Sequence, residues 1–193
     1  MAHGGVAVAY RAATMTTKSI TILPNPERYE VLTTVSTIAG HARKLVTIAA
    51  YIPPGYTVTR GRGCLSFISD LVIDAKRRYR EPYLAISGDF NQWDAGQAIE
   101  DFLDISEVDV GPTRGLSTID RIFVNFGNMV TDKGSVPPLD VDPGDQGSPS
   151  DHRVAFAKCD LKRVEAFEWI SYKYLYYNED SVEQFGEYLR NIS

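Results

Sequence analysis

Apolar residues in the first two-thirds of the chain form short runs separated by turn residues, a pattern that predicts strands. The segments 29–38, "YEVLTTVSTI", and 44–52, "KLVTIAAYI", are rich in β-branched residues and are predicted to pair as a hairpin across Gly40. Shorter runs of the same kind predict further strands at 5–10, 19–23, 83–87, 119–125 and 153–158.

Helical spacing of apolar residues is clearest in 64–80, "CLSFISDLVIDAKRRYR", which is predicted to form an amphipathic helix. A shorter helix is predicted at 95–103. Strands therefore outnumber helices, and polar clusters follow the strand ends. This arrangement predicts a layered α/β (α+β) fold whose site is built from loops at one edge of a sheet.

The bulk properties narrow the class of protein. The chain has 193 residues, which predicts one main domain; we expect it at 1–160, with a C-terminal extension or linker at 161–193. A net charge of -5 argues against a protein that coats nucleic acid through positive charge, but it does not exclude an enzyme that cuts nucleic acid, because acids that hold a metal lower the net charge. Cys64 and Cys159 are predicted to be reduced and buried. Neither a membrane span nor a signal peptide is predicted.

The segment "SGDFN" ends a buried-looking strand on an acid. Asp89 and Asn91 are two residues apart, so both side chains would leave the strand end on one face. The Asp89 carboxylate accepts hydrogen bonds, and the Asn91 amide both donates and accepts them. Such a pair can orient a water molecule and a phosphate oxygen. The ordinary alternative is a simple turn, which a Gly-Asp pair after a strand usually means.

Three further clusters carry candidate chemistry. The segment "STIDRIFVN" places Asp120 at a strand start, where a cap or salt bridge is the ordinary alternative. The segment "SPSDHRVAF" places Asp151 and His152 before an apolar strand, and a histidine beside an acid at a strand mouth is a candidate acid/base group. In "IAAYIPPG", Tyr51 ends a strand stopped by two prolines, where the alternative is a core tyrosine.

Together these side chains favour one chemistry. Asp120 would orient a ring nitrogen of His152, as in a triad, with Asp89 as a second acid and Tyr51 as a donor to an anionic oxygen. The sequence has no G-x-S-x-G, Walker A, H-E-x-x-H or C-x-x-C motif. The cluster therefore favours attack of water at a phosphate, assisted by a hard metal ion.

The order of "GGVAVAYR", "AAYIPP", "SGDFN", "STIDRIFV" and "SDH" resembles the motif order of the endonuclease/exonuclease/phosphatase superfamily. Its members include pancreatic deoxyribonuclease, apurinic endonucleases and the endonuclease domains of LINE-type retrotransposons, and this chain looks most like the last. The resemblance implies a four-layer α/β sandwich of the deoxyribonuclease-like type. It also implies that Tyr51 stabilises the phosphate, that Asn91 positions it, and that His152, paired with Asp120, binds the scissile phosphate.

The resemblance assigns the metal, Mg²⁺ or alternatively Mn²⁺, to Asp151 and Asp89, and Asp89 would also act as the base or water orienter. In the family pattern an Asn and then a Glu, the principal metal ligand, precede the Gly-Gly-Val strand. Here that strand begins at residue 4 and the first acid is Glu27. We therefore expect a domain truncated at the N-terminus that binds Mg²⁺ weakly.

The tail "FEWISYKYLYYNEDSVEQFGEYL" resembles the segment that joins the endonuclease to the reverse transcriptase in some retrotransposon polyproteins. The resemblance implies DNA as a partner, a reverse transcriptase domain in a parent polyprotein, and a nuclear location. Arg60 and Arg62 are predicted to contact DNA beside the site. For the basic run 76–80, a solvated helix face is favoured over DNA contact.

Three functions follow from these patterns. The leading one is a metal-dependent phosphodiesterase, a DNA endonuclease that nicks one strand by water attack at phosphate. The first alternative is a catalytically impaired remnant that binds nucleic acid or a partner, because the sequence lacks the early Glu. The second alternative is a small-molecule or lipid phosphoesterase of the same superfamily, against which the retroelement-like tail argues.

Overall fold

The computed structural model describes residues 6–27, 29–93, 99, 105–137 and 151–161. Its elements, in chain order, are β1 (Met15–Ser19), β2 (Glu30–Ile38), β3 (Lys44–Tyr51), α1 (Val58–Arg78), β4 (Tyr83–Asp89), β5 (Ser106–Glu107), β6 (Asp120–Val124), the 3-10 helix η1 (Gly127–Met129), β7 (Val130–Val136) and β8 (Val154–Cys159). Within the described part of the chain, no helix is long and apolar enough to cross a bilayer.

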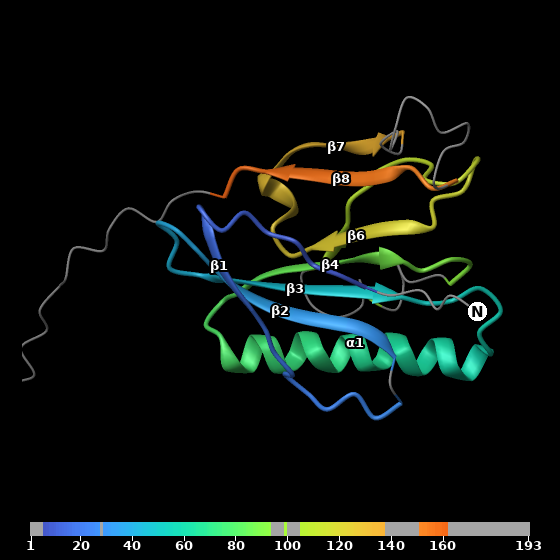
Figure 1. The fold of residues 1–193 in the computed structure, drawn as a ribbon, viewed down its shortest axis with the longest axis horizontal. Coiled ribbons are helices and arrows are strands. Elements are labelled where there is room, and N and C mark those ends of the chain that lie inside the picture. Colours follow the sequence, from blue (N-terminus) through green and yellow to red (C-terminus); the bar gives the residue numbers. More distant parts are fainter. Residues whose placement is uncertain (1–5, 28, 94–98, 100–104, 138–150, 162–193) are drawn as a thin grey trace, which may run out of the picture. The chain divides into compact units, whose positions relative to one another are not determined.

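Six strands form a mixed sheet in the order β1-β2-β3-β4-β6-β5 (Figure 1). The predicted hairpin is confirmed, because β2 and β3 pair antiparallel through a turn in which Gly40 has a φ of 79°, a conformation that glycine adopts without strain. β3 and β4 are parallel, because α1 connects them and returns the chain to the end of the sheet at which β3 begins. Both strands therefore finish at the same end, where antiparallel β6 begins.

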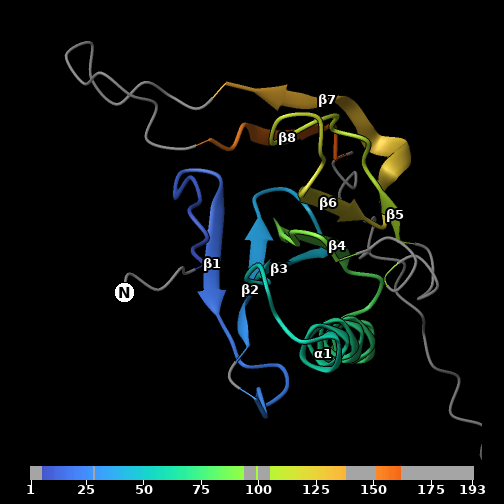
Figure 2. The same ribbon diagram turned by 90° about the vertical axis from the view of Figure 1, so that its right-hand side faces the viewer.

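Each face of the six-stranded sheet has its own hydrophobic core. On one face α1 packs against alternate residues of β3 and β4, such as the fully buried Ile48 and Ile86. On the other face Tyr83 and Val124 pack with residues of β7 and β8, which form a separate antiparallel pair. Figure 2 shows α1, the six-stranded sheet and the β7–β8 pair as successive layers. The predicted α/β (α+β) class is confirmed, and the described residues supply three of the four expected layers.

The long helix begins earlier than the predicted residue 64. Thr57 caps it, because its Oγ1 accepts a hydrogen bond from the Arg60 N–H at 3.3 Å. Two glycines in the first turns hide this start in the sequence, since glycine disfavours helix. The packing at Gly61 leaves no room for a side chain, because a Cβ atom there would come within 2.3 Å of the Trp93 ring.

Three other segments differ from the sequence predictions. The predicted strand 5–10 is wrong for residues 6–10, which pair with no strand, and of 19–23 only Ser19 belongs to a strand. An apolar run does not distinguish an extended segment from a paired strand, because pairing depends on distant residues. β7 was not predicted, because its sequence VTDKGSV is mostly polar. The helix at 95–103 and the extension at 161–193 lie, apart from Ile99 and Leu161, outside the described residues.

Candidate active site

Three candidate residues form a row across the sheet at the end where β3 and β4 finish. Tyr51 lies opposite Asp89 in the β3–β4 pair, and Asp89 lies opposite Asp120 in the β4–β6 pair. Residues directly opposite one another project from the same face of a sheet. This is the face that packs against β7 and β8, because Tyr83 and Val124, at even spacing from Asp89 and Asp120, belong to that core.

The row has a fourth member that motif reasoning missed. Glu30, the first residue of β2, lies opposite Tyr51 and shares its face. Its Oε2 atom is buried and has no hydrogen-bond partner among the residues that the structure describes. The signal was present in the predicted hairpin, because a register centred on the Gly40 turn places Glu30 opposite Tyr51.

The backbone around Asp89 explains the segment "SGDFN". A Cβ atom on Gly88 would come within 1.8 Å of the Ala50 carbonyl oxygen, so glycine is needed where β4 approaches β3. The Asn91 N–H then donates to Asp89 Oδ1 at 2.9 Å, and Asn91 adopts a left-handed φ of 48°. The buried Asn91 side chain donates through Nδ2 to the Ile52 carbonyl at 2.8 Å. Asn91 therefore joins the ends of β3 and β4, and its role at the phosphate stays a prediction.

The structure brings His152 and Asp120 together, although they are 32 positions apart in the sequence. Nδ1 of His152 lies 3.0 Å from Oδ2 and 3.3 Å from Oδ1 of Asp120. In the tautomer that carries its proton on Nδ1, the imidazole donates to the carboxylate, which fixes the ring orientation. This is the geometry that the predicted Asp-His pair requires.

Thr113 holds both members of this pair, and sequence reasoning missed it. The residue is fully buried, and its Oγ1 accepts hydrogen bonds from the N–H groups of Asp120 and Ile119 at 3.0 and 3.1 Å. Its carbonyl accepts from the Arg153 N–H at 2.7 Å, next to His152. A threonine in an irregular segment carries no recognisable signal in a single sequence, so only the fold identifies it.

Asp151 forms an ion pair with Arg114. Its Oδ2 accepts from Nε of Arg114 at 2.7 Å, and its Oδ1 lies 3.8 Å from Nε2 of His152. The Asp151 side chain is 65% exposed. Its predicted contact with a metal stays a prediction.

Asp89, Asp120 and His152 form a group that fits a divalent cation. Each offers a ligand atom, and these atoms all lie within 4.8 Å of one another. Carboxylate oxygens are the ligands that Mg²⁺ takes from proteins, and they also suit Mn²⁺. Of the two predicted metal ligands, Asp89 belongs to this group and Asp151 does not.

The raised pKa of the Asp89 carboxyl group is consistent with a cation-binding site. Burial raises the pKa of its carboxyl group above the ordinary value, and the charge of Asp120 raises this pKa further. The hydrogen bond from the Asn91 N–H lowers the pKa, as do the charges of His152 and Arg114. A carboxyl group that resists ionisation beside a second acid is typical of sites that bind a cation or transfer a proton.

Two depressions adjoin the row. One, of about 260 Å³, is lined by Tyr51 and Asp89 together with small residues of β3 and β4 and the segment at Val6. The other, of about 820 Å³, is lined by Asn91, Arg114 and residues of the 115–121 segment, with Asp151 beside them. The predicted residues at this end of the sheet are therefore divided between two depressions: Tyr51 and Asp89 line one, and Asn91 and Asp151 line the other.

Arg60 and Arg62 lie in the first two turns of α1, at the same end of the sheet as the row but on the helical face. Arg60 stacks on the Tyr56 ring at 4.4 Å from the ring centroid, and both arginines are exposed. Neither lines the depression that contains Asn91 and Asp151. Their predicted DNA contact stays a prediction.

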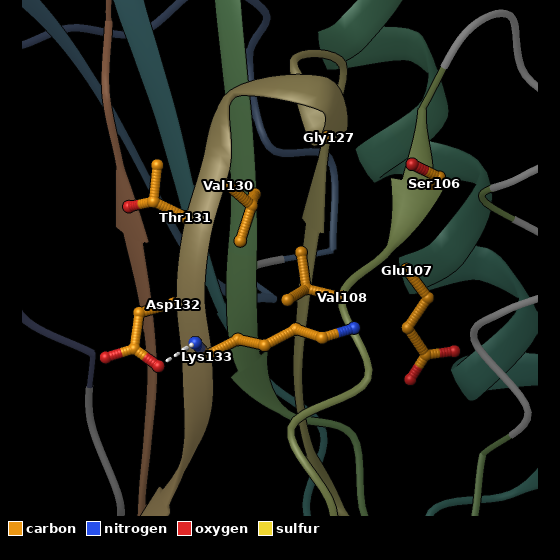
Figure 3. Close-up of a pocket in the computed structure, with 8 residues that line it drawn as sticks. All are labelled: Ser106, Glu107, Val108, Gly127, Val130, Thr131, Asp132 and Lys133. Atoms are coloured by element: carbon orange, nitrogen blue, oxygen red, sulfur yellow. Dashed lines mark hydrogen bonds between the residues drawn. The ribbon is translucent and has the colours of Figure 1, made fainter.

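A third hollow, of about 280 Å³, lies between β5 and β7 (Figure 3). Figure 3 shows Glu107 on one side and Asp132 on the other, with the Lys133 side chain extending from β7 toward Val108. None of the predicted site residues lines this hollow. It therefore takes no part in the chemistry proposed below.

Comparison with known proteins bears on the fold. No family model matches the sequence, and no curated protein matches it. A humanized D. rerio TDP2 crystal structure is similar at 15% identity and a TM-score of 0.51, over 74% of this chain and 66% of that one. A functionally unknown protein from Enterococcus faecalis V583 is similar at 15% identity and a TM-score of 0.54, over 78% and 69%. The endonuclease domain of TRAS1, a telomere-specific non-LTR retrotransposon, is similar at 12% identity and a TM-score of 0.51, over 77% and 70%.

The chain therefore has the deoxyribonuclease-like fold that these structures share. This confirms the fold that the order of five short motifs predicted. The chain spans about two thirds of the length of the D. rerio structure. The likeness concerns the fold, and the residues of the site have to carry any argument about activity.

Proposed function

We propose that this chain is a metal-dependent phosphodiesterase, a DNA endonuclease that nicks one strand by water attack at phosphate. The observation that carries the proposal is the 3.0 Å contact between His152 Nδ1 and Asp120 Oδ2, beside Asp89 in the same row. The TRAS1 domain is an endonuclease, and a D. rerio TDP2 structure, similar at 14% identity with a TM-score of 0.50, is complexed with a single-strand DNA product. Both support DNA as the substrate class.

Each residue has a task that follows from its surroundings. In the imidazolium form of His152, Nδ1–H donates to Asp120 and Nε2–H donates to an oxygen of the scissile phosphate. Asp89, whose pKa burial raises, accepts a proton from the attacking water. Tyr51 lies opposite Asp89, and its hydroxyl donates a hydrogen bond to a phosphate oxygen on which charge develops. The water oxygen forms a bond to phosphorus, the bond from phosphorus to one sugar oxygen breaks, and that sugar oxygen takes a proton from solvent water, which leaves a nicked strand.

Asp89 and Asp120 would hold the metal, Mg²⁺ or Mn²⁺, with His152 beside them. When bound, the ion supplies positive charge to the phosphate and lowers the pKa of a water. Mn²⁺ is expected to support more activity than Mg²⁺, because it binds sites that mix nitrogen and oxygen donors more readily.

The test is nicking of supercoiled plasmid with Mg²⁺ or Mn²⁺, with and without chelator. His152→Ala is expected to lower the rate by roughly 10²–10⁴-fold, the usual contribution of a positioned acid/base group. His41→Ala is the matched control, because His41 is half-buried in the turn after β2, at the opposite end of the sheet.

Three outcomes would contradict the proposal. Cleavage that survives chelator, or that is unchanged by His152→Ala, would point to another site or a contaminant. Binding of DNA without cleavage would favour the nucleic-acid-binding module. Cleavage of a soluble phosphate ester but not of plasmid would favour the small-molecule or lipid phosphoesterase.

A further inference from the structure

Arg114 is held rigidly next to the candidate site. A tight turn fixes its backbone, because the Arg114 N–H donates to the Ser117 carbonyl at 3.0 Å and the Ser117 N–H donates back at 2.9 Å. Gly115 takes the left-handed φ of 57° that this turn requires. Thr113, the preceding residue, binds the backbone of Asp120. The position of Arg114 is therefore coupled to the position of the Asp-His pair.

The guanidinium of Arg114 lines the depression of about 820 Å³ together with Asn91 and Asp151. Its Nε donates to Asp151 Oδ2 at 2.7 Å, and the other oxygen of Asp151 lies 3.8 Å from Nε2 of His152. The charge of Arg114 also reaches Asp89, since it lowers the pKa of that carboxyl group. A phosphate bound to His152 would thus lie within the field of Arg114.

The site needs a cation for a phosphate, because Asp89, Asp120 and Asp151 all contribute negative charge. Among the described residues that line the depression, the cations are Arg114 and Arg121. Arg121 bonds to Glu107 at 3.3 Å and its side chain is 19% exposed, whereas the side chain of Arg114 is 49% exposed. Of these two arginines, Arg114 is therefore the more accessible from solvent.

The bond between Arg114 and Asp151 is easily exchanged. Exposed ion pairs stabilise proteins little, because water screens them and long side chains lose freedom. A phosphate group instead takes a guanidinium in a bidentate, charge-assisted pair, for which arginine is better suited than lysine. The exchange also releases the Asp151 carboxylate beside Nε2 of His152.

We propose that Arg114 is the phosphate-binding arginine of this site, held by Asp151 in the free protein and transferred to the substrate's phosphate on binding. The inference rests on the proposed function, since it names the residue that recognises the phosphate of the strand to be cut. Asp151 acts in it as a positioning residue that keeps the guanidinium in place.

The test measures binding without chemistry. The probe is a short fluorescein-labelled single-stranded oligonucleotide, titrated in chelator at several salt concentrations and followed by anisotropy. Arg114→Ala is expected to weaken binding about tenfold, and to lower the slope of log affinity against log salt by about 0.7, the value for one phosphate contact on a single strand. Arg114→Lys should keep the slope but lose affinity, because lysine retains the charge and not the bidentate geometry.

The matched control is Arg43→Ala. Arg43 is also an arginine in an ion pair, with Glu81, and its side chain is 41% exposed, but it lies at the opposite end of the sheet. Its removal is expected to leave affinity and slope unchanged. Circular dichroism checks that each variant is folded.

Asp151→Asn tests the exchange. It is expected to raise affinity for the oligonucleotide several-fold, because the Arg114 guanidinium no longer has to break an ion pair with the Asp151 carboxylate before it binds phosphate. In the Arg114→Ala background this gain should disappear. A full gain in that background would show that removal of a negative charge explains the effect and that Asp151 does not hold Arg114.

A wild-type slope in Arg114→Ala, with wild-type protein binding the oligonucleotide, overturns the inference and leaves the proposed function standing. If wild-type protein binds no oligonucleotide, DNA as the substrate fails, and titration with inorganic phosphate decides the inference. A shift of the Arg114 Nε–H resonance in nuclear magnetic resonance then supports phosphate binding, and an unmoved resonance overturns it.

Discussion

Replacement of Thr113 by valine tests how the fold builds the site. Valine has almost the same shape as threonine, but it removes the hydroxyl that accepts from the N–H groups of Ile119 and Asp120. The side chain of Thr113 is fully buried, so no water replaces the acceptor from that side. Both N–H groups lose their partner in one substitution.

The size of the effect follows from these two hydrogen bonds. A buried donor left without an acceptor costs about 1–3 kcal/mol. Ile119 and Asp120 are half-buried, so the lower part of this range applies to each. We expect Thr113→Val to lower the free energy of unfolding by about 2–3 kcal/mol. Cleavage should fall by roughly 10²-fold as well, because a small displacement of Asp120 misorients His152.

Urea unfolding followed by circular dichroism measures the stability, and plasmid nicking measures the activity. Thr113→Ser is the matched control, because it keeps the hydroxyl and loses only a buried methyl group, at about 1 kcal/mol. Its activity should stay close to wild type. Equal stability of the valine and serine variants, or full cleavage by Thr113→Val, would refute this account of how Asp120 is positioned.

Three further changes test separate parts of the structure. Gly61→Ala should lower the free energy of unfolding by about 1–3 kcal/mol through overpacking, although alanine favours helix, because its Cβ meets the Trp93 ring; a gain in stability would contradict that packing. Since burial raises the pKa of Asp89, the metal-free folded protein loses stability as pH rises through that pKa, from about 4 upward. Asp89→Asn should therefore gain stability over wild type as pH rises and match it below about 4; urea titrations in chelator that show no divergence would argue against burial of a charge there. Tyr51→Phe should lower nicking by roughly 10- to 10²-fold, the worth of one hydrogen bond to a charged group, and by less than His152→Ala does; an equal loss would assign Tyr51 a larger role.

The sequence predicted the parts of the fold that local patterns determine. Strand 29–38 and strand 44–52 form the expected hairpin, because β-branched residues flank a single glycine turn. The carboxyl end of the strand at 83–87 carries Asp89 as expected, and β3 and β4 bring Tyr51 next to it. Motif order also indicated the pairing of Asp120 with His152, and the structure places them 3.0 Å apart.

Features that depend on long-range packing left no trace in the sequence. The segment 6–10 is apolar, yet it pairs with no strand, because pairing is decided by distant residues. Thr113 and Arg114 lie in an irregular segment, and their importance comes only from contacts with Asp120 and Asp151. Asp151 was predicted near the metal from its place in a motif, and its observed partner depends on a turn far away in the sequence.

The most direct test of the central claim is a double-mutant cycle on His152 and Asp120, measured as the rate of metal-dependent plasmid nicking. If the two side chains act as one unit, as their 3.0 Å contact implies, His152→Ala and Asp120→Asn should each lower the rate by roughly 10²–10⁴-fold. The double variant should then be no slower than the slower single variant, because residues that act together lose their effect together. Losses that multiply in the double variant, or a rate untouched by either substitution, would contradict the assignment of this pair as the catalytic core.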